Sequence, residues 1–113
     1  VTYYNIDGCW ELYMFHGAPL QEDTYLYIEF SRSDHRYQMW DNLNSMYGIS
    51  TTGTFYITEE EDGTYTLSGN YDHGAGDWSS NYKVEMSSTD NMTWRSTETI
   101  LDFRRIDSIP DIN

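Results

Sequence analysis

The segment 72–78, Asp-His-Gly-Ala-Gly-Asp-Trp, places one histidine and two carboxylates close enough together to suggest metal chemistry. Zinc would need further histidine or cysteine ligands, which this segment lacks. The calcium-loop pattern of alternating oxygen ligands that ends in a bidentate glutamate is also absent. We therefore expect a solvated loop here and no metal. His16 and His35 lie near predicted turns, where a polar ring is unremarkable.

No pattern of catalytic residues stands out elsewhere in the chain. There is no serine elbow, no phosphate-binding glycine loop and no His-Glu-x-x-His motif. Cys9 is the only cysteine, so an intrachain disulfide is impossible. A small thiol in a strand usually packs, and no obvious base lies beside it in the sequence. The sequence therefore predicts a non-enzymatic protein without a cofactor.

The aromatic residues are the more informative group, because tyrosine and tryptophan bind both apolar ligands and sugars. They make up 17% of the chain, with eleven Tyr and four Trp. Some of them alternate away from the clearest core residues, namely Tyr13, Tyr25, Tyr27 and Tyr56. Two tryptophans lie at or in loops, where they could frame a ligand opening. The candidate ligand-binding residues are Trp40, Trp78, Met39, Tyr56 and Tyr82.

The charge balance limits the classes of partner. The chain carries six Lys and Arg against nineteen Asp and Glu, for a net charge of −13. Nucleic-acid binding requires a basic footprint, and so does docking to an anionic membrane surface. We therefore expect neither. No apolar run approaches the length of a transmembrane segment.

The elements that would position these residues are strands, because apolar side chains recur at alternate positions. Asp62-Gly63, next to the acidic run 59–62, is the strongest hairpin signal. Short polar connections favour antiparallel pairing, and closure removes the open edges. We predict an all-β fold, a single eight-stranded antiparallel up-and-down barrel with little or no helix. The predicted strands are 7–15, 24–31, 36–40, 53–58, 63–68, 82–86, 92–96 and 100–104.

One domain is expected over residues 1–113, with a strand core at about 6–106 and a tail at 107–113 that frays. The side chains predicted to point into the barrel are bulky. In a small barrel they could leave a ligand cavity or fill the interior completely. They are Trp10, Leu12, Met14, Leu26, Ile28, Phe30, Met39, Phe55, Ile57, Leu67, Val84, Met86, Trp94, Leu101 and Phe103.

Both ends of the chain carry a family resemblance. Gly8-Cys9-Trp10 matches the Gly-x-Trp signature of lipocalins and other calycins, and Arg104-Arg105 resembles the basic residue on their last strand. The strand layout over residues 6–106 resembles the compact lipocalin-like domains of exported bacterial proteins, many of unknown function. The resemblance implies that an arginine lies across the Trp10 ring and closes one end of the barrel. If Leu101 and Phe103 point inward, the alternation of the strand places Arg105 on the same face, whereas a bulge at the strand end would place Arg104 there instead.

Two functions follow as expectations. The first is a non-enzymatic lipocalin-like protein that binds a small apolar or amphipathic ligand in the barrel interior or mouth. The alternative is an interaction module with a filled core that binds a glycan or a partner protein through surface aromatics. The resemblance also implies an exported protein, periplasmic or lipid-anchored at the cell surface, whose targeting segment is absent from this chain.

Overall fold

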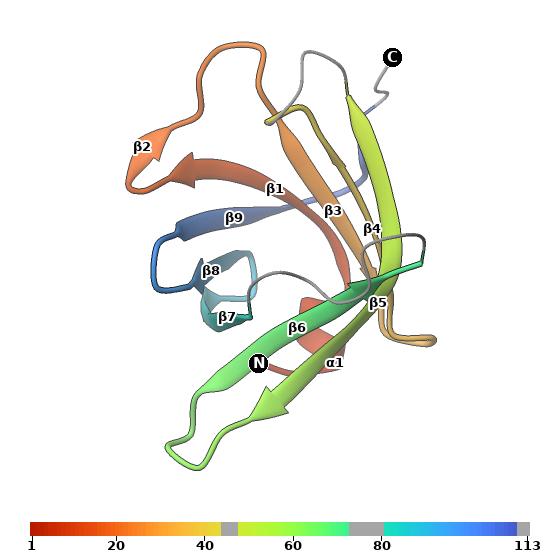
Figure 1. The fold of residues 1–113 in the computed structure, drawn as a ribbon, viewed down its shortest axis with the longest axis vertical. Helices are drawn as coiled ribbons and strands as arrows, with labels where there is room; N and C mark the ends of the chain where they lie inside the picture. Colours follow the sequence, from red (N-terminus) through yellow and green to blue (C-terminus); the bar gives the residue numbers. More distant parts are fainter. Residues whose placement is uncertain (44–47, 73–80, 111–113) are drawn as a thin grey trace.

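The computed structural model describes residues 1–43, 48–72 and 81–110. Eight antiparallel strands form a closed barrel, which confirms the predicted fold class. Each strand pairs with the next one along the chain, and β9 returns to pair with β1 (Figure 1). The barrel strands are β1 (Gly8–Phe15), β3 (Leu26–Ser31), β4 (Arg36–Asp41), β5 (Ile49–Glu59), β6 (Tyr65–Tyr71), β7 (Tyr82–Ser88), β8 (Asn91–Arg95) and β9 (Ile100–Ile106).

Two tight hairpins show how turn residues set the strand register. His16 and Gly17 join β1 to the two-residue strand β2 (Ala18–Pro19), and both have positive φ, 53° and 78°. This is the signature of a type I′ turn. Between β5 and β6, Gly63 has a φ of 85°, and the Glu60 amide donates to the carbonyl of Thr64 at 2.7 Å. The hairpin predicted at Asp62-Gly63 is confirmed.

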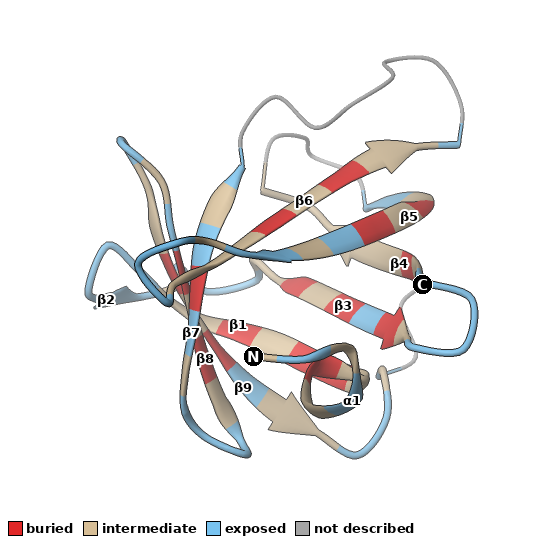
Figure 2. Ribbon diagram, turned by 90° about the horizontal axis from the view of Figure 1, so that it is seen from below, coloured by how far each residue is buried: buried red, intermediate tan, exposed pale blue. Residues whose placement is uncertain are grey.

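The core follows the alternation of the strands. Buried positions along β3 and β5 are separated by more exposed ones, as Figure 2 shows. Of the side chains predicted to point inward, eleven are buried, and Met39, Ile57 and Met86 pack against them while partly exposed. Three buried core residues were not predicted: Ile6, Tyr37 and Met92.

Met14 is the predicted inward residue that the structure places differently. The β1–β9 register shifts between Leu12 and Met14, so the strand gains one extra residue there. Beyond this bulge Met14 pairs with Asp102, and Phe15 takes the position opposite Leu101. A one-residue shift exchanges the two faces of a strand. Phe15 therefore lies on the inner face instead of Met14.

One short helix, α1 (Tyr3–Ile6), precedes the barrel, although Val1 to Tyr4 resembles a strand in sequence. The Thr2 side chain accepts a hydrogen bond from the Asn5 amide at 3.1 Å, and the Thr2 amide donates to Asn5 Oδ1 at 2.7 Å. This capping box satisfies two groups at the helix start. Ile6 is fully buried, and α1 lies at the end of the barrel remote from β2 (Figure 1).

Among the described residues, the ladder between β6 and β7 joins Tyr65, Thr66 and Leu67 to Val84, Lys83 and Tyr82. Residues 69–71 of β6 pair with β5. Among the described residues, no helix has the length and apolar character needed to cross a membrane.

Candidate functional site

The closed end of the barrel is organised around Trp10. Trp10 on β1 and Arg105 on β9 are direct partners in the ladder, and the Arg105 guanidinium carbon lies 4.3 Å from the centre of the indole. A guanidinium over an indole face gains a cation–π attraction. Leu101 and Phe103 are buried, so Arg105, two positions after Phe103, is the arginine expected on the inner face. Of the two arginines left open by the sequence, Arg105 is the one that packs on Trp10.

Arg105 also satisfies backbone carbonyls around α1. Its Nη1 donates to the Asp7 carbonyl and its Nη2 to the Asn5 carbonyl, both at 2.7 Å, while Nε donates to the Thr89 carbonyl at 2.9 Å. Trp10 Nε1 donates to the Ile6 carbonyl at 2.8 Å. The last carbonyls of a helix lack partners within it. Here Trp10 from β1 and Arg105 from β9 donate the missing hydrogen bonds, and these bonds hold α1 against this end of the barrel.

Gly8 and Arg104 differ in how they relate to the Trp10–Arg105 contact. Gly8 has a φ of 111°, which disfavours other residues, and a Cβ there would lie 2.9 Å from Arg105 Nη1. The close neighbour of Gly8 is thus the guanidinium of Arg105. Arg104 points elsewhere: it pairs with Glu11 and lies over the Tyr13 ring at 5.5 Å.

The opposite end of the barrel holds a cavity of about 630 Å³. Its lining comes from all barrel strands except β5, and β2 with the segment after it forms part of the rim. The lining is mainly apolar and aromatic. The lining residues are Phe15, Ala18, Pro19, Leu20, Gln21, Thr24, Leu26, Met39, Asp41, Leu43, Tyr71, Tyr82, Trp94, Thr99 and Leu101.

Asp41 is the one acidic residue among these lining residues, and none of them is Lys, Arg or His. Burial raises the pKa of its carboxyl group, against the lowering effect of the hydrogen bond that the Leu43 amide donates to Oδ1 at 3.2 Å. A carboxylate in an apolar setting is costly unless it is paired. Asp41 is therefore the electrostatic feature of this cavity.

Besides Phe15, three aromatic rings line the same cavity. Tyr82 and Trp94 lie with ring centres 5.3 Å apart, and Tyr71 comes from the adjacent part of β6. Burial raises the pKa of the Tyr82 hydroxyl, with a further contribution from Tyr71. These rings form part of the cavity wall.

The predicted ligand-binding residues divide between the two faces of the barrel. Met39 and Tyr82 line the cavity. Trp40 follows Met39 on β4 and falls on the outer face, across from Tyr27, and Tyr56 is 42% exposed on the outside of β5. Trp78 lies outside the described residues. Asp41 was missed, although the alternation of Tyr37 and Met39 extends to it.

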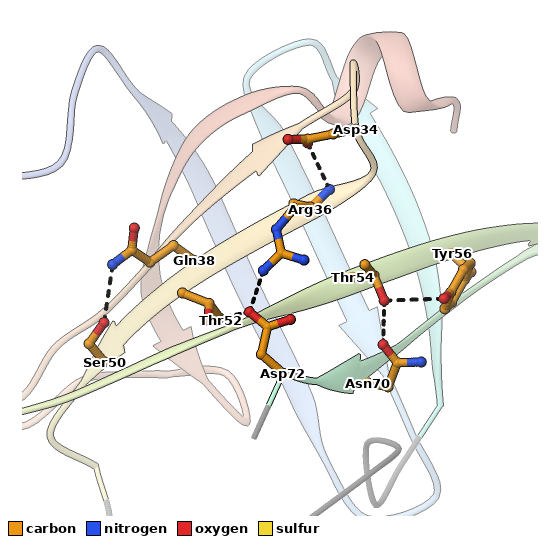
Figure 3. A network of polar contacts seen from close by, with 9 residues as sticks. All are labelled: Asp34, Arg36, Gln38, Ser50, Thr52, Thr54, Tyr56, Asn70 and Asp72. Carbon is orange, nitrogen blue, oxygen red and sulfur yellow. Dashed lines mark hydrogen bonds and ion pairs between the residues drawn. The ribbon is translucent and has the colours of Figure 1, made fainter. Parts of the chain in front are cut away.

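The outer face of β4, β5 and β6 carries a polar network (Figure 3). Arg36 pairs with Asp72, which also accepts a hydrogen bond from Thr52 Oγ1 at 2.6 Å. Thr54 contacts Asn70 and lies 3.1 Å from the Tyr56 hydroxyl. These side chains satisfy one another across neighbouring strands, as cross-strand pairs do. This surface is therefore polar.

A second outer region, on β3 and β4, is aromatic. The Tyr25 and Tyr27 rings stack with centres 5.5 Å apart, and Trp40 is the ladder partner of Tyr27. We call Tyr25, Tyr27 and Trp40 the outer aromatic row; each is partly exposed. Burial and the nearby Glu11 carboxylate raise the pKa of Tyr27.

The remaining chemical groups of the sequence take structural positions. Cys9 is buried on the face of β1 away from Trp10, and burial with the Glu29 carboxylate raises the pKa of its thiol. A raised thiol pKa lowers the thiolate fraction and hence its reactivity. No group of three or more potential metal ligands occurs within residues 1–43, 48–72 and 81–110. The histidine of the segment 72–78 lies outside these ranges.

No family model matches the chain, and neither the curated proteins nor the solved structures provide a match. The candidate site is therefore described from its own geometry. A closed eight-stranded antiparallel barrel is compatible with a lipocalin-like fold.

Proposed function

We propose that this protein is a lipocalin-like, non-enzymatic carrier that binds a small apolar or amphipathic ligand in the mouth of its barrel. The observation that carries the proposal is the cavity of about 630 Å³ at the end opposite α1. Ligand sites are concave and mostly apolar, with volumes of roughly 300–1,000 Å³ and a few polar groups. The cavity has this size and character.

The packing of the barrel supports the same assignment. Trp10, Phe30, Phe55 and Phe103 are almost completely buried, and Trp94, which lines the cavity, contacts the rings of Phe30 and Phe103. A ligand would therefore enter from the open end and rest on this aromatic core. The Gly8, Trp10 and Arg105 arrangement supports kinship with calycins, and export or surface anchoring is proposed on the same resemblance.

A blocked cavity tests the proposal. Met39→Trp adds a bulky ring inside the cavity, whereas Gln38→Trp adds the same ring to the outer face of the same strand. Native mass spectrometry of protein isolated gently from its host, followed by ligand identification after unfolding, is the measurement. We expect the wild type and Gln38→Trp to retain a small molecule and Met39→Trp to lose it. Because Met39→Trp could disturb packing, all three proteins are first compared by circular dichroism. No retained molecule in a folded wild type, with no binding of added amphiphiles, would contradict the proposal.

The outer aromatic row supports a second candidate function, the binding of a glycan or a partner protein. Stacked, partly exposed tyrosines beside a tryptophan offer ring faces of the kind that sugars contact. A glycan array with the wild type and Trp40→Ala distinguishes the two functions. Loss of a glycan signal in Trp40→Ala, with no effect of Met39→Trp, would favour the outer row.

A further inference from the structure

We infer that the mouth cavity selects an amphiphile with a positively charged ammonium group, which pairs with Asp41 while the apolar part of the ligand fills the cavity. This inference rests on the proposed function and specifies the class of ligand. A neutral or anionic amphiphile would fill the same volume but leave Asp41 without a cationic partner.

No Lys, Arg or His is among the described residues that line the cavity with Asp41. All six Lys and Arg residues are described, and none lines the cavity. Arg36, Arg104 and Arg105 form ion pairs with other acids. Arg32 lies over the Tyr4 ring at 4.8 Å, the Lys83 ammonium donates to Thr64 at 2.8 Å, and Arg95 is exposed.

The apolar surroundings of Asp41 also favour a cationic partner for its carboxylate. The cavity lining is mainly apolar, and a carboxylate that loses water there is stabilised by a counter-charge that it meets at short distance. The other described lining residues include no Asp, Glu, Lys, Arg or His. Within this described lining, a bound ammonium would therefore meet one carboxylate and no basic side chain.

The aromatic rings of the cavity favour a bound cation as well. Tyr71, Tyr82 and Trp94 line the same cavity as Asp41. The faces of tyrosine and tryptophan rings attract cations, and several such rings together form the cages that bind alkylated ammonium groups. The net charge of −13 attracts cations to the molecule as a whole. Aromatic wall, carboxylate and overall field all favour the same charge.

A set of probes with the same chain separates this inference from the proposed function. The probes are decylammonium, decanol and decanoate, and binding is measured by calorimetry and by the change in tryptophan fluorescence. We expect decylammonium to bind about tenfold or more tightly than decanol, because hydrogen bonds to charged groups contribute about 1.5–3 kcal/mol. Decanoate should bind more weakly than decanol, because its carboxylate is repelled by Asp41.

The variants identify the group responsible. Asp41→Asn should lower the affinity for decylammonium about tenfold and leave the affinity for decanol unchanged. Glu98→Gln removes an equal charge from an exposed position beside the cavity residue Thr99 and should leave the preference for the amine intact. Equal binding of all three probes, or an equal loss in both variants, would overturn the cationic inference and leave the carrier function standing. Failure of all three probes to bind would overturn both.

The ammonium could belong to a free amine or to a lipid headgroup. Lysophosphatidylethanolamine with a decanoyl chain carries the same group next to a phosphate. Tighter binding of this lipid than of decylammonium would assign the ligand to the lipids, and weaker binding would assign it to the free amines.

Discussion

The two ends of this barrel differ in packing: one is closed by a hydrogen-bonded helix, and the other holds a cavity. At the end closed by α1, Arg105 and Trp10 satisfy the helix carbonyls, and the aromatic core side chains behind them are almost completely buried. At the other end, the side chains leave a cavity with one carboxylate, and none of its described lining residues is Lys, Arg or His. The comparison suggests that stability is concentrated at the closed end and ligand selection at the open end. Four variants test this separation.

The largest effect on stability is expected at Arg105. Arg105→Met removes a cation from the Trp10 face and leaves the carbonyls of Asn5, Asp7 and Thr89 without this donor. We expect the free energy of unfolding to fall by about 2–4 kcal/mol, because a carbonyl that loses its partner away from water costs about 1–3 kcal/mol. The bonds to Asn5 and Asp7 are partly buried, whereas the bond to Thr89 is exposed and water replaces it. Urea unfolding followed by circular dichroism measures the change.

The neighbouring arginine provides a matched control. Arg104 has a side chain that is 57% exposed and an ion pair with Glu11, against 28% exposure for Arg105. Exposed ion pairs contribute little, so Arg104→Met should cost no more than about 1 kcal/mol. Similar losses in the two variants would mean that the closed end does not depend on the Arg105 contacts.

A smaller effect on stability, but a larger one on binding, is expected at Phe15. The bulge in β1 places this residue at the cavity, where it is 42% exposed. Phe15→Ala should lower the free energy of unfolding by about 1 kcal/mol or less, since much of the ring already meets water. The affinity for decylammonium and for decanol should fall together, about threefold to tenfold. A loss of stability as large as that of Arg105→Met would break the separation between the two ends.

The smallest effect concerns the pH dependence of stability. Burial raises the pKa of Asp41 in the folded state above its ordinary value, so the folded protein binds this proton more tightly than the unfolded chain does. The contribution of Asp41 is therefore most favourable below the ordinary pKa and is lost as pH rises through the raised folded pKa. In Asp41→Asn this component disappears, and unfolding in urea at a series of acidic pH values should show a smaller decline of stability with rising pH. A decline identical to that of the wild type would contradict the burial of this carboxyl group.

Much of the fold could be predicted from the sequence because strand alternation is a local pattern. The alternation of Leu26, Ile28 and Phe30 fixed a strand and its inner face, and the spacing of Phe103 and Arg105 selected the arginine on Trp10. The α1 helix could not be predicted in this way. Its four residues include two β-favouring tyrosines, and it is held by contacts with β9 that are distant in sequence.

The candidate site was harder to predict than the fold. The bulge that brings Phe15 to the cavity leaves no mark in the alternation of β1, because it depends on the register with β9. Asp41 ends a strand next to an irregular segment, and a charged residue there is typical of an exposed turn. Its inward position became evident once Tyr37 and Met39 were placed on the inner face.

The return of β9 to β1 has a consequence for how the chain folds. The other barrel ladders join strands that follow one another, whereas the pair Glu11 and Arg104 is separated by 93 residues. Long-range contacts form slowly because the entropy of closing a large loop must be lost first. We therefore expect the hairpins to form early as a curled open sheet, with β1 and β9 as exposed edges that can associate with other chains. The rate of folding, and the yield when many chains fold at once, then depend on how quickly these two edges find each other.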